Sequence, residues 1–294
     1  MISAQEWLRR LSRLNVSRSK AKGPAPNKPL LALALLDMVE AGLVPADGRV
    51  AKDAQLQLRF RTYSPICVRR RGNRIDLDLP WKHLASDGLY AHVDESRDLI
   101  QLSPGFMRVL MDSSLRRQAR VILVTTYFPP DEQVALFAAL GMGPPSSQEI
   151  AQVKEDAANY QTLVRRGRDA RFRVNVISGY HFTCALTGYR LETTRGFNLL
   201  QAAHIQAHAS RGPDVATNGL ALTPTAHELF DAGLWTINDD LTIRVAKSAF
   251  AETRLPASPH FLLADLHGRR LHFAPASTLR PDPLYLAWHR SHHP

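Results

Sequence analysis

The sequence has little of what stabilises a secreted or membrane protein. It contains two cysteines, Cys67 and Cys184, too few for a disulfide framework or for a zinc site made of cysteines. The best candidate for a membrane span, residues 29–39, has about half the length that a spanning helix needs. Charged residues interrupt the first ten positions, so no signal peptide is expected there. These absences predict a cytoplasmic protein with reduced thiols and no membrane partner.

Positive charge is in excess, and it is unevenly placed along the chain. The net charge is +10. Residues 1–120 hold 21 Lys and Arg against 12 Asp and Glu, which gives +9, whereas residues 121–294 hold 16 against 15. Solubility alone explains many basic proteins, but this asymmetry favours a polyanionic partner. Double-stranded DNA is the expected partner of the first two-fifths of the chain.

Hydrophobic periodicity and turn signals predict an α+β protein with three regions. Residues 1–128 are expected to form a small, basic α/β domain, and residues 129–175 a helical linker. Residues 176–294 complete the chain as a third region. Within the first region, helices are expected over residues 3–15, from Pro29 to about Ala41 and over residues 104–119, and a short strand over 99–102.

Arginines cluster at two places in these regions. Ser146 and Glu149 predict the capped start of a linker helix that runs to about Val164. It is followed by a run of arginines: Arg165, Arg166, Arg168, Arg171 and Arg173. This run is either a connector that tracks DNA or a solvated helix end. A second cluster, Arg69, Arg70, Arg71 and Arg74, lies on a predicted turn, where it is either a solvated hairpin tip or a phosphate contact.

The most informative stretch, residues 199–236, reads LLQAAHIQAHASRGPDVATNGLALTPTAHELFDAGLWT. Its pattern predicts a short strand that ends at His204, a polar loop, a second short strand over 220–222 and a helix after Pro224. His204, Asn218 and His227 stand at the junctions, 14 and 9 residues apart. The order and the flanking AAHI, GPD, NGLAL and HELFDAG resemble the ββα-metal fold of the HNH endonucleases.

The resemblance implies a metal-dependent hydrolase of DNA phosphodiester bonds. A neutral histidine at a strand end, here His204, can take a proton from water near neutral pH. The resemblance places a divalent metal, Mg²⁺ or Mn²⁺, at His227, and Asp231 lies on the same helix face at i+4. It gives Asn218 the task of holding the strand that bears the base. An Asn-Gly turn of purely structural purpose is the alternative for Asn218.

The sequence departs from the family pattern at two places. Many family members carry Asp or His directly before the base, as a metal ligand, where this chain has Ala203. The metal would then be held by His227, Asp231, water and substrate phosphate, or by a ligand from elsewhere. Many also have two Cys-x-x-Cys pairs that bind zinc, whereas Cys184 stands alone here, so no structural zinc is expected. The segment around Cys184 is expected to be a hairpin that is held by the packing of four apolar side chains instead of by zinc: Phe182, Leu186, Tyr189 and Leu191.

The front region resembles the sulfur-binding domain of phosphorothioate-dependent restriction endonucleases. The similarity lies in APNKPLLAL at residues 25–33 and in LPWKHLASDGLY at residues 79–90. It implies a front domain that reads a phosphorothioated backbone and an HNH domain that cuts nearby. A sulfur atom suits an apolar cup rimmed by groups that meet the remaining charge. The candidates are Asn27, Lys28, Arg74, Leu79, Pro80 and His83.

Several alternatives remain open at this point. Family members usually have Tyr where this chain has Leu79, so a reader of a modified base or a general DNA-binding platform competes with the sulfur reader. Pro80-Trp81 is otherwise a strand end with a core aromatic. Arg173 and Arg211 are further candidates for phosphate contacts near the cut. A DNA reader with an inactive HNH domain is the competing function, and double-strand cutting would require a homodimer.

The end of the chain completes the expected architecture. The tail over residues 279–289 is expected to form a closing helix after an X-Pro stop. His289, His292 and His293 follow as a polar C-terminal end rather than as a metal site.

Overall fold

The computed structural model describes residues 3–20, 23–67, 76–93, 98–143, 157–191, 199–253 and 262–293, with the backbone alone for 157–161. These residues fall into two compact units, unit 1 (Met1–Arg171) and unit 2 (Phe172–Pro294). Residues 129–171, expected to belong to a linker, therefore count with unit 1. No described helix is both long enough and apolar enough to cross a membrane.

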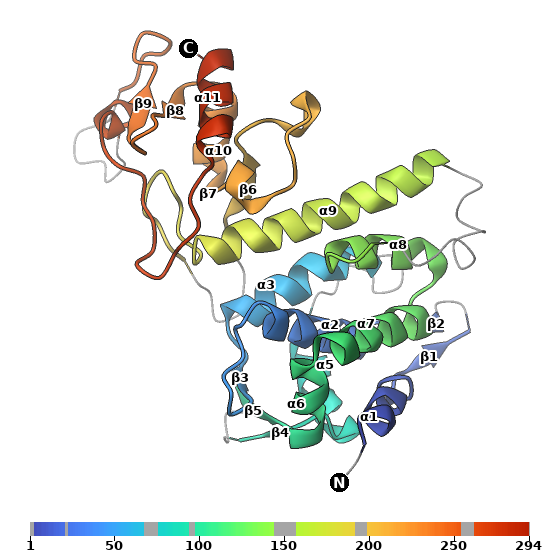
Figure 1. The fold of residues 1–294 in the computed structure, drawn as a ribbon. Coiled ribbons are helices and arrows are strands. Elements are labelled where there is room, and N and C mark those ends of the chain that lie inside the picture. The colour runs from blue at the N-terminus through green and yellow to red at the C-terminus, as the bar shows by residue number, and fades with distance from the viewer. Residues whose placement is uncertain are drawn as a thin grey trace. The chain divides into compact units, whose positions relative to one another are not determined.

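The described residues of unit 1 form a group of helices with small antiparallel sheets beside it (Figure 1). Its elements in chain order are α1 (Ala4–Leu11), β1 (Arg18–Ser19), β2 (Gly23–Pro24), α2 (Asn27–Glu40), β3 (Arg49–Ala51), α3 (Ala54–Tyr63), η1 (Ser64–Cys67), α5 (Asp78–His83), η2 (Leu84–Asp87), β4 (Tyr90–His92), β5 (Leu99–Leu102), α6 (Pro104–Met111), α7 (Ser113–Tyr127), α8 (Pro130–Ala139) and the first part of α9 (Ala157–Gly179). The strand order β3-β5-β4 places Val50 opposite Ile100 and Tyr90 opposite Leu102.

Helix α2 forms the centre of unit 1. Its residues 30–36 are all fully buried, as expected of a helix that is apolar on every side. Helices α3, α5, α6 and α7 pack around it (Figure 1). The helix ends just before Gly42, whose φ of 68° is a left-handed conformation that glycine adopts without strain. The structure therefore confirms the expected helix from Pro29 to about Ala41.

Two local expectations for unit 1 were wrong, and so was the alternative that Pro80-Trp81 forms a strand end. The helix expected over 104–119 is two helices, because Asp112 leaves the helical conformation and its carboxylate accepts the Leu115 amide at 2.8 Å. Pro80 and Trp81 lie in helix α5 rather than at a strand end. The arginines from 165 to 173 lie inside α9, which continues to Gly179, and not beyond its end. The capping residues Ser146 and Glu149 lie outside the described residues.

Unit 2 contains two β-hairpins and two short helices (Figure 1). Its elements are the end of α9, β6 (Gln201–His204), η3 (His208–Ser210), η4 (Ala216–Asn218), β7 (Gly219–Leu222), α10 (Pro224–Asp231), β8 (Trp235–Ile237), β9 (Ile243–Val245), η5 (Leu263–Leu266) and α11 (Pro283–His292). Strands β8 and β9 pair antiparallel, and α11, the expected closing helix, packs against β8. The Trp235 indole joins α10 to this hairpin by donating to the Ala226 carbonyl at 3.1 Å.

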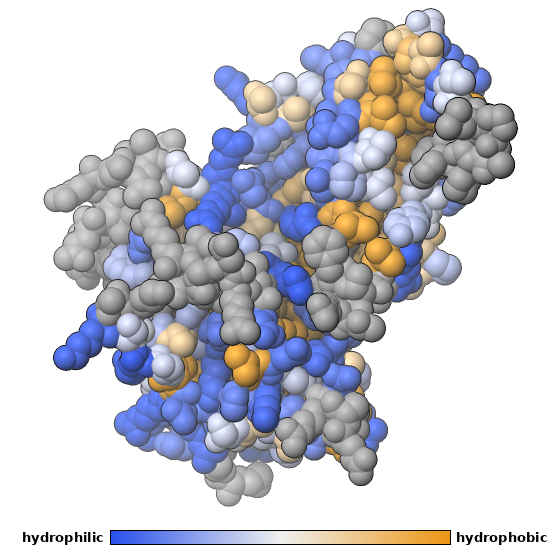
Figure 2. Space-filling view, turned by 180° about the vertical axis from the view of Figure 1, so that it is seen from behind, coloured by the Kyte–Doolittle hydropathy of each residue, from blue (hydrophilic) through white to orange (hydrophobic). Residues whose placement is uncertain are grey.

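Among the described residues, eight large apolar side chains are exposed. They are Leu79, Val93 and Met111 in unit 1 and Tyr189, Leu191, Leu199, Val215 and Leu284 in unit 2. Figure 2 shows one face on which hydrophilic residues alternate with smaller apolar patches. Tyr189 and Leu191, expected to stabilise the hairpin by packing, are therefore at the surface, whereas Phe182 and Leu186 are buried.

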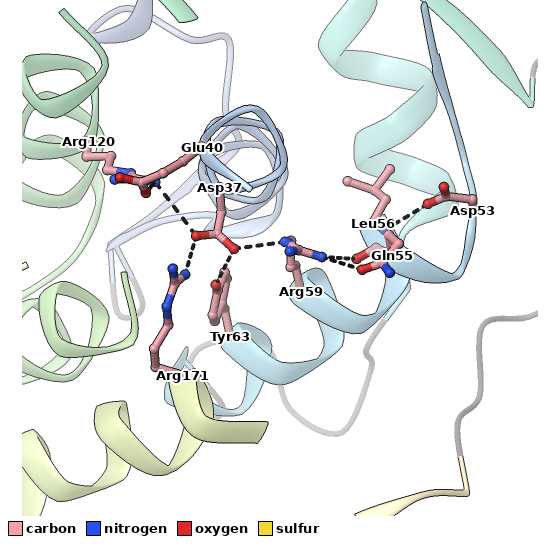
Figure 3. A network of polar contacts seen from close by, with 9 residues as sticks. All are labelled: Asp37, Glu40, Asp53, Gln55, Leu56, Arg59, Tyr63, Arg120 and Arg171. Carbon is pink, nitrogen blue, oxygen red and sulfur yellow. Dashed lines mark hydrogen bonds and ion pairs between the residues drawn. The ribbon is translucent and has the colours of Figure 1, made fainter. Parts of the chain in front are cut away.

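A buried carboxylate links four helices of unit 1, α2, α3, α7 and α9 (Figure 3). Asp37 of α2 is 1% exposed and pairs with Arg59 of α3 at 2.8 Å and with Arg171 of α9. The Tyr63 hydroxyl donates to it at 3.0 Å, and Arg120 lies 3.7 Å away. Burial opposes ionisation of Asp37, but the positive charges of Arg171, Arg59 and Arg120 outweigh it and lower its pKa.

Replacing Asp37 by alanine is expected to destabilise unit 1 by about 3–5 kcal/mol, because buried arginines lose their counter-charge. Calorimetry of the full chain would show one transition moved to lower temperature. Asp47→Ala is the matched control, since Asp47 is exposed and pairs with its neighbour Arg49. An Asp37→Ala protein that melts like the control would contradict the role given to this carboxylate.

His289 belongs to the core of unit 2 and not to a polar tail. It is 3% exposed, stacks on Phe230 with ring centroids 3.8 Å apart, and shares a hydrogen bond with the Thr236 hydroxyl at 2.8 Å. Burial lowers the pKa of His289 to about 4. The imidazole is therefore neutral in the folded protein near neutral pH. His292, one helical turn away, is exposed.

The unfolding free energy of unit 2 is expected to fall as the pH drops from about 6.5 to about 4. In this window the unfolded chain binds a proton at His289 that the folded chain excludes. The full loss is about 3 kcal/mol for a shift of this size. His289→Gln should flatten the pH dependence of urea unfolding, and His292→Gln should not. Equal pH dependence in wild type and His289→Gln would contradict the assignment.

Candidate active site

A strand–loop–strand–helix element in unit 2 carries the predicted site residues. Strands β6 and β7 pair antiparallel, with Gln201 opposite Leu222 and His204 opposite Gly219. A side chain on Gly219 would approach Val176 of α9 to 2.3 Å, so the position requires glycine. Helix α10 begins directly after β7, with Pro224 in its first turn. The secondary structure expected for residues 199–231 is therefore confirmed.

His204 stands at the end of β6 with its ring held on two sides. The Phe172 ring stacks on it at 3.9 Å between centroids and 9° between planes. The Nε2 atom lies 3.0 Å from Oδ1 of Asp214, in the loop that follows β6. The side chain is 20% exposed, so one edge of the ring remains accessible.

Asn218 fixes the two ends of the loop between β6 and β7. It is fully buried. Its Oδ1 accepts the Gln206 amide at 2.8 Å, and its Nδ2 donates to the carbonyls of Gln206 at 3.1 Å and Pro213 at 3.0 Å. These bonds place Asp214, the next residue after Pro213, beside His204. Asn218 is therefore more than an Asn-Gly turn residue.

His227 lies on α10, and its two ring nitrogens have different partners. Nδ1 is 2.8 Å from Oε1 of Gln201 on β6, and Nε2 is 3.3 Å from Oδ2 of Asp231. Asp231 is 61% exposed at its side chain. Gln201 therefore connects α10 to the strand that bears His204, although no hydrogen bond joins the two histidines directly.

The donor set at α10 suits a divalent metal with an incomplete protein shell. One imidazole and one carboxylate, 3.3 Å apart, match the ligand types of Mn²⁺ and, in part, of Mg²⁺. Within the described part of the chain, no three His, Cys, Asp or Glu side chains converge to hold a metal. Ala203 is fully buried opposite Leu220 and offers no ligand. Water and phosphate oxygens would have to complete the coordination.

Cys184, for which no structural zinc was expected, has a protein partner in Thr223. Its Sγ accepts the Thr223 amide at 3.4 Å and lies 3.9 Å from the Thr223 hydroxyl. Thr223 sits in the Leu222-Thr223-Pro224 segment, where a second cysteine would be expected. The contact joins the segment after α9 to the start of α10.

The predicted arginines of unit 2 differ in their surroundings. Arg173 follows Phe172 on α9, and burial lowers the pKa of its guanidinium. Among the described residues it has no hydrogen-bond or ion-pair partner. Arg211 is exposed in the loop between β6 and β7 with a left-handed φ of 64°. The sequence analysis did not assign roles to Gln201, Asp214 or Phe172. The one available signal was the position of Asp214, an acidic residue four positions before Asn218.

Unit 1 has a pocket where the sulfur-binding resemblance places its residues. The pocket measures about 300 Å³ and is lined by Asn15, Val16, Ser17, Ala25, Asn27, Lys28, Leu79, Pro80, His83 and Ser86. Five of these were candidates: Asn27, Lys28, Leu79, Pro80 and His83. The other four DNA-binding candidates of this region, Arg69, Arg70, Arg71 and Arg74, lie outside the described residues.

The pocket combines apolar and polar walls. Leu79 is 51% exposed and stands beside buried Pro80 at the start of α5. Lys28 forms an ion pair with Asp87 at 2.6 Å, with both side chains largely buried. Among the residues that the structure describes, the Oδ1 atom of Asn27 is buried and has no hydrogen-bond partner. An unsatisfied buried oxygen is costly, so a ligand that donates to it would gain affinity.

Comparison with known proteins identifies the nuclease element. Residues 184–238 match the family model of the HNH endonucleases. This part of the chain is therefore similar to an HNH endonuclease domain. Enzymes of this family generally use a divalent metal.

A solved structure also resembles part of the chain. One solved structure, described as a modification-dependent TagI restriction endonuclease, shares 28% sequence identity at a TM-score of 0.33. The similarity covers 42% of this chain and 38% of that one. No curated protein matches the sequence.

Replacing Asn218 by alanine is expected to loosen the β6–β7 loop and to cost about 2–4 kcal/mol, since it leaves one amide and two carbonyls without partners. Hydrogen exchange at the Gln206 amide should accelerate strongly. Asn238→Ala is the matched control, because Asn238 bonds only within its own β-turn. Unchanged exchange at Gln206 in Asn218→Ala would contradict this account.

Proposed function

We propose that this protein is a type IV-like restriction endonuclease for phage defence, which binds modified, phosphorothioated DNA through the unit 1 pocket and cuts it with the HNH domain. The observation that carries the nuclease half is the ββα element with His204 at the end of β6, Asn218 directly before β7 and His227 on α10. The observation behind the reader half is the pocket, which gathers five residues predicted from two distant segments.

In the proposed reaction, His204 is the general base. It takes a proton from a water molecule whose oxygen attacks the phosphorus atom, and the bond from phosphorus to the 3′ oxygen breaks. His227 and Asp231 would hold Mg²⁺ or Mn²⁺, which when bound stabilises negative charge on phosphate and leaving oxygens. Asn218 holds the loop that carries Asp214. Arg173, which has no described protein partner, and exposed Arg211 are the proposed phosphate contacts.

The pocket suits a phosphorothioate for two reasons. Leu79 and Pro80 offer an apolar wall, and sulfur is larger and less hydrated than oxygen. Asn27 and Lys28 are the first two residues of the 14-residue helix α2, so their backbone amides lack intrahelical acceptors and favour an anion. His83 and the Arg69–Arg74 cluster are the further proposed DNA contacts.

A modified base is the second candidate ligand, because of the Oδ1 atom of Asn27. The orphan Oδ1 of Asn27 needs a hydrogen-bond donor, which a phosphorothioate lacks and a base amino group has. A pocket of about 300 Å³ is also large enough for an extruded base. Since one HNH site cuts one strand, double-strand cutting would require a homodimer on DNA.

The decisive experiment compares cleavage of matched phosphorothioated, base-methylated and unmodified duplexes by the full chain, with Mg²⁺, Mn²⁺ or EDTA. We expect cutting of the phosphorothioated duplex alone, only with metal, and at least 100-fold slower in His204→Ala, the usual minimum for loss of a general base. If the protein cuts all duplexes in the presence of metal, the nuclease proposal stands and the proposed selectivity for phosphorothioate is rejected. Binding without cutting by wild type would identify a reader with an inactive HNH domain.

A pocket variant separates reading from cutting. Leu79→Glu places a charge on the apolar wall and should weaken binding of the phosphorothioated duplex by at least tenfold. Met111→Glu is the matched control, because Met111 is an equally exposed apolar residue of unit 1 that does not line the pocket. Equal binding by both variants would place the recognition surface elsewhere.

A further inference from the structure

We propose that Asp214 is the residue that orients His204 and selects its tautomer, so that Nδ1 is the atom that receives the proton from water. This inference rests on the proposed function of His204 as general base. Its physical basis is the single short contact between Asp214 Oδ1 and His204 Nε2, 3.0 Å long.

The contact determines which ring nitrogen carries hydrogen in the neutral imidazole. A carboxylate offers only acceptors, so the nitrogen that faces it must be the donor. Nε2 therefore holds the hydrogen and Nδ1 keeps the lone pair. Among the described residues, Nδ1 of His204 has no hydrogen-bond partner, and the side chain is 20% exposed. A water molecule can reach the basic nitrogen.

Two further contacts limit the movement of this pair. The Phe172 ring stacks on His204 almost in parallel, at 9° between planes, so the imidazole cannot tilt without losing that contact. Asn218 holds the Pro213 carbonyl at 3.0 Å, which anchors the backbone next to Asp214. The Asp214 side chain is itself only 15% exposed, so water competes weakly for its oxygens. The ring is therefore fixed by a carboxylate at its edge and an aromatic at its face.

The alternative role for Asp214 is that of the metal ligand that Ala203 does not supply. The geometry favours orientation, because the Asp214 oxygen faces His204, whereas His227 Nε2 faces Asp231 on α10. No described group of three potential ligands includes Asp214. The two roles predict different results when metal affinity and rate are measured separately.

The test compares Asp214→Asn, Asp214→Glu and Asp265→Asn in the full chain, on a duplex that the wild type cuts. An asparagine amide can donate to Nε2 and invert the tautomer, so Asp214→Asn should lower kcat by about 100-fold or more with little change in KM. Asp214→Glu should recover part of the rate. Asp265→Asn, which removes an exposed carboxylate on η5, should leave the rate unchanged.

Two readouts separate orientation from a metal-ligand or folding role. In histidine labelled with ¹⁵N, the ring-nitrogen shifts of His204, assigned by their loss in His204→Ala, should show hydrogen on Nε2 in wild type and a changed tautomer in Asp214→Asn. Affinity for Mn²⁺, titrated directly, should be unchanged. Adding Asp214→Asn to His204→Ala should lower the rate no further.

The proposal is overturned by hydrogen on Nδ1 in wild type, by normal kcat in Asp214→Asn, or by a rate that excess metal restores. If the wild type cuts no duplex, the nuclease proposal fails on its own. The nitrogen shifts still decide whether Asp214 selects the tautomer.

Discussion

The three hydrogen bonds of the Asn218 side chain are the constraint on which the candidate site depends. The loop between β6 and β7 has little regular structure, so its backbone must be held by something other than a strand ladder. A fully buried amide, which offers both donor and acceptor, closes this loop by binding Gln206 and Pro213. The bond to the Pro213 carbonyl anchors the backbone directly before Asp214, whose carboxylate lies 3.0 Å from His204. An apolar residue of the same size would fill the space and leave the loop without a fixed path.

Both candidate histidines have one nitrogen engaged by a side chain that the motif does not include. Asp214 faces Nε2 of His204, and Gln201 faces Nδ1 of His227. A histidine side chain has two neutral tautomers and several rotamers. A site that uses the lone pair of one ring nitrogen must therefore disfavour the other tautomer and the other rotamers. Gln201, the partner of His227, and His204 stand at the two ends of the four-residue strand β6. The strand therefore fixes the position of the His227 partner relative to His204.

The sequence predicted the parts of this structure that are encoded locally. Helix α2 follows from an unbroken apolar run, and the ββα element from the spacing of His204, Asn218 and His227. Helix α5 was missed because the alternation of Leu77 and Leu79 is typical of a strand. What decides the conformation there is tertiary: Trp81 is buried, and its carbonyl accepts the Tyr90 hydroxyl at 2.5 Å. Phe172, Gln201 and Asp214 could not be assigned roles, because their partners depend on the path of a loop and on the packing of α9.

The Lys28–Asp87 ion pair in the unit 1 pocket would help a protein that binds modified DNA to discriminate against unmodified DNA. A free lysine at the start of α2 would attract any phosphate, modified or not. Lys28 is instead neutralised by Asp87, whose other oxygen accepts the Asn15 amide at 2.7 Å, so the pair is fixed from two sides. With that charge cancelled, attraction to an unmodified phosphate is weakened. In the proposed reader, the remaining preference would come from the Leu79–Pro80 wall for a phosphorothioate, or from the buried Asn27 oxygen for a base that carries a donor; both respond to the chemistry of the modification and not to charge.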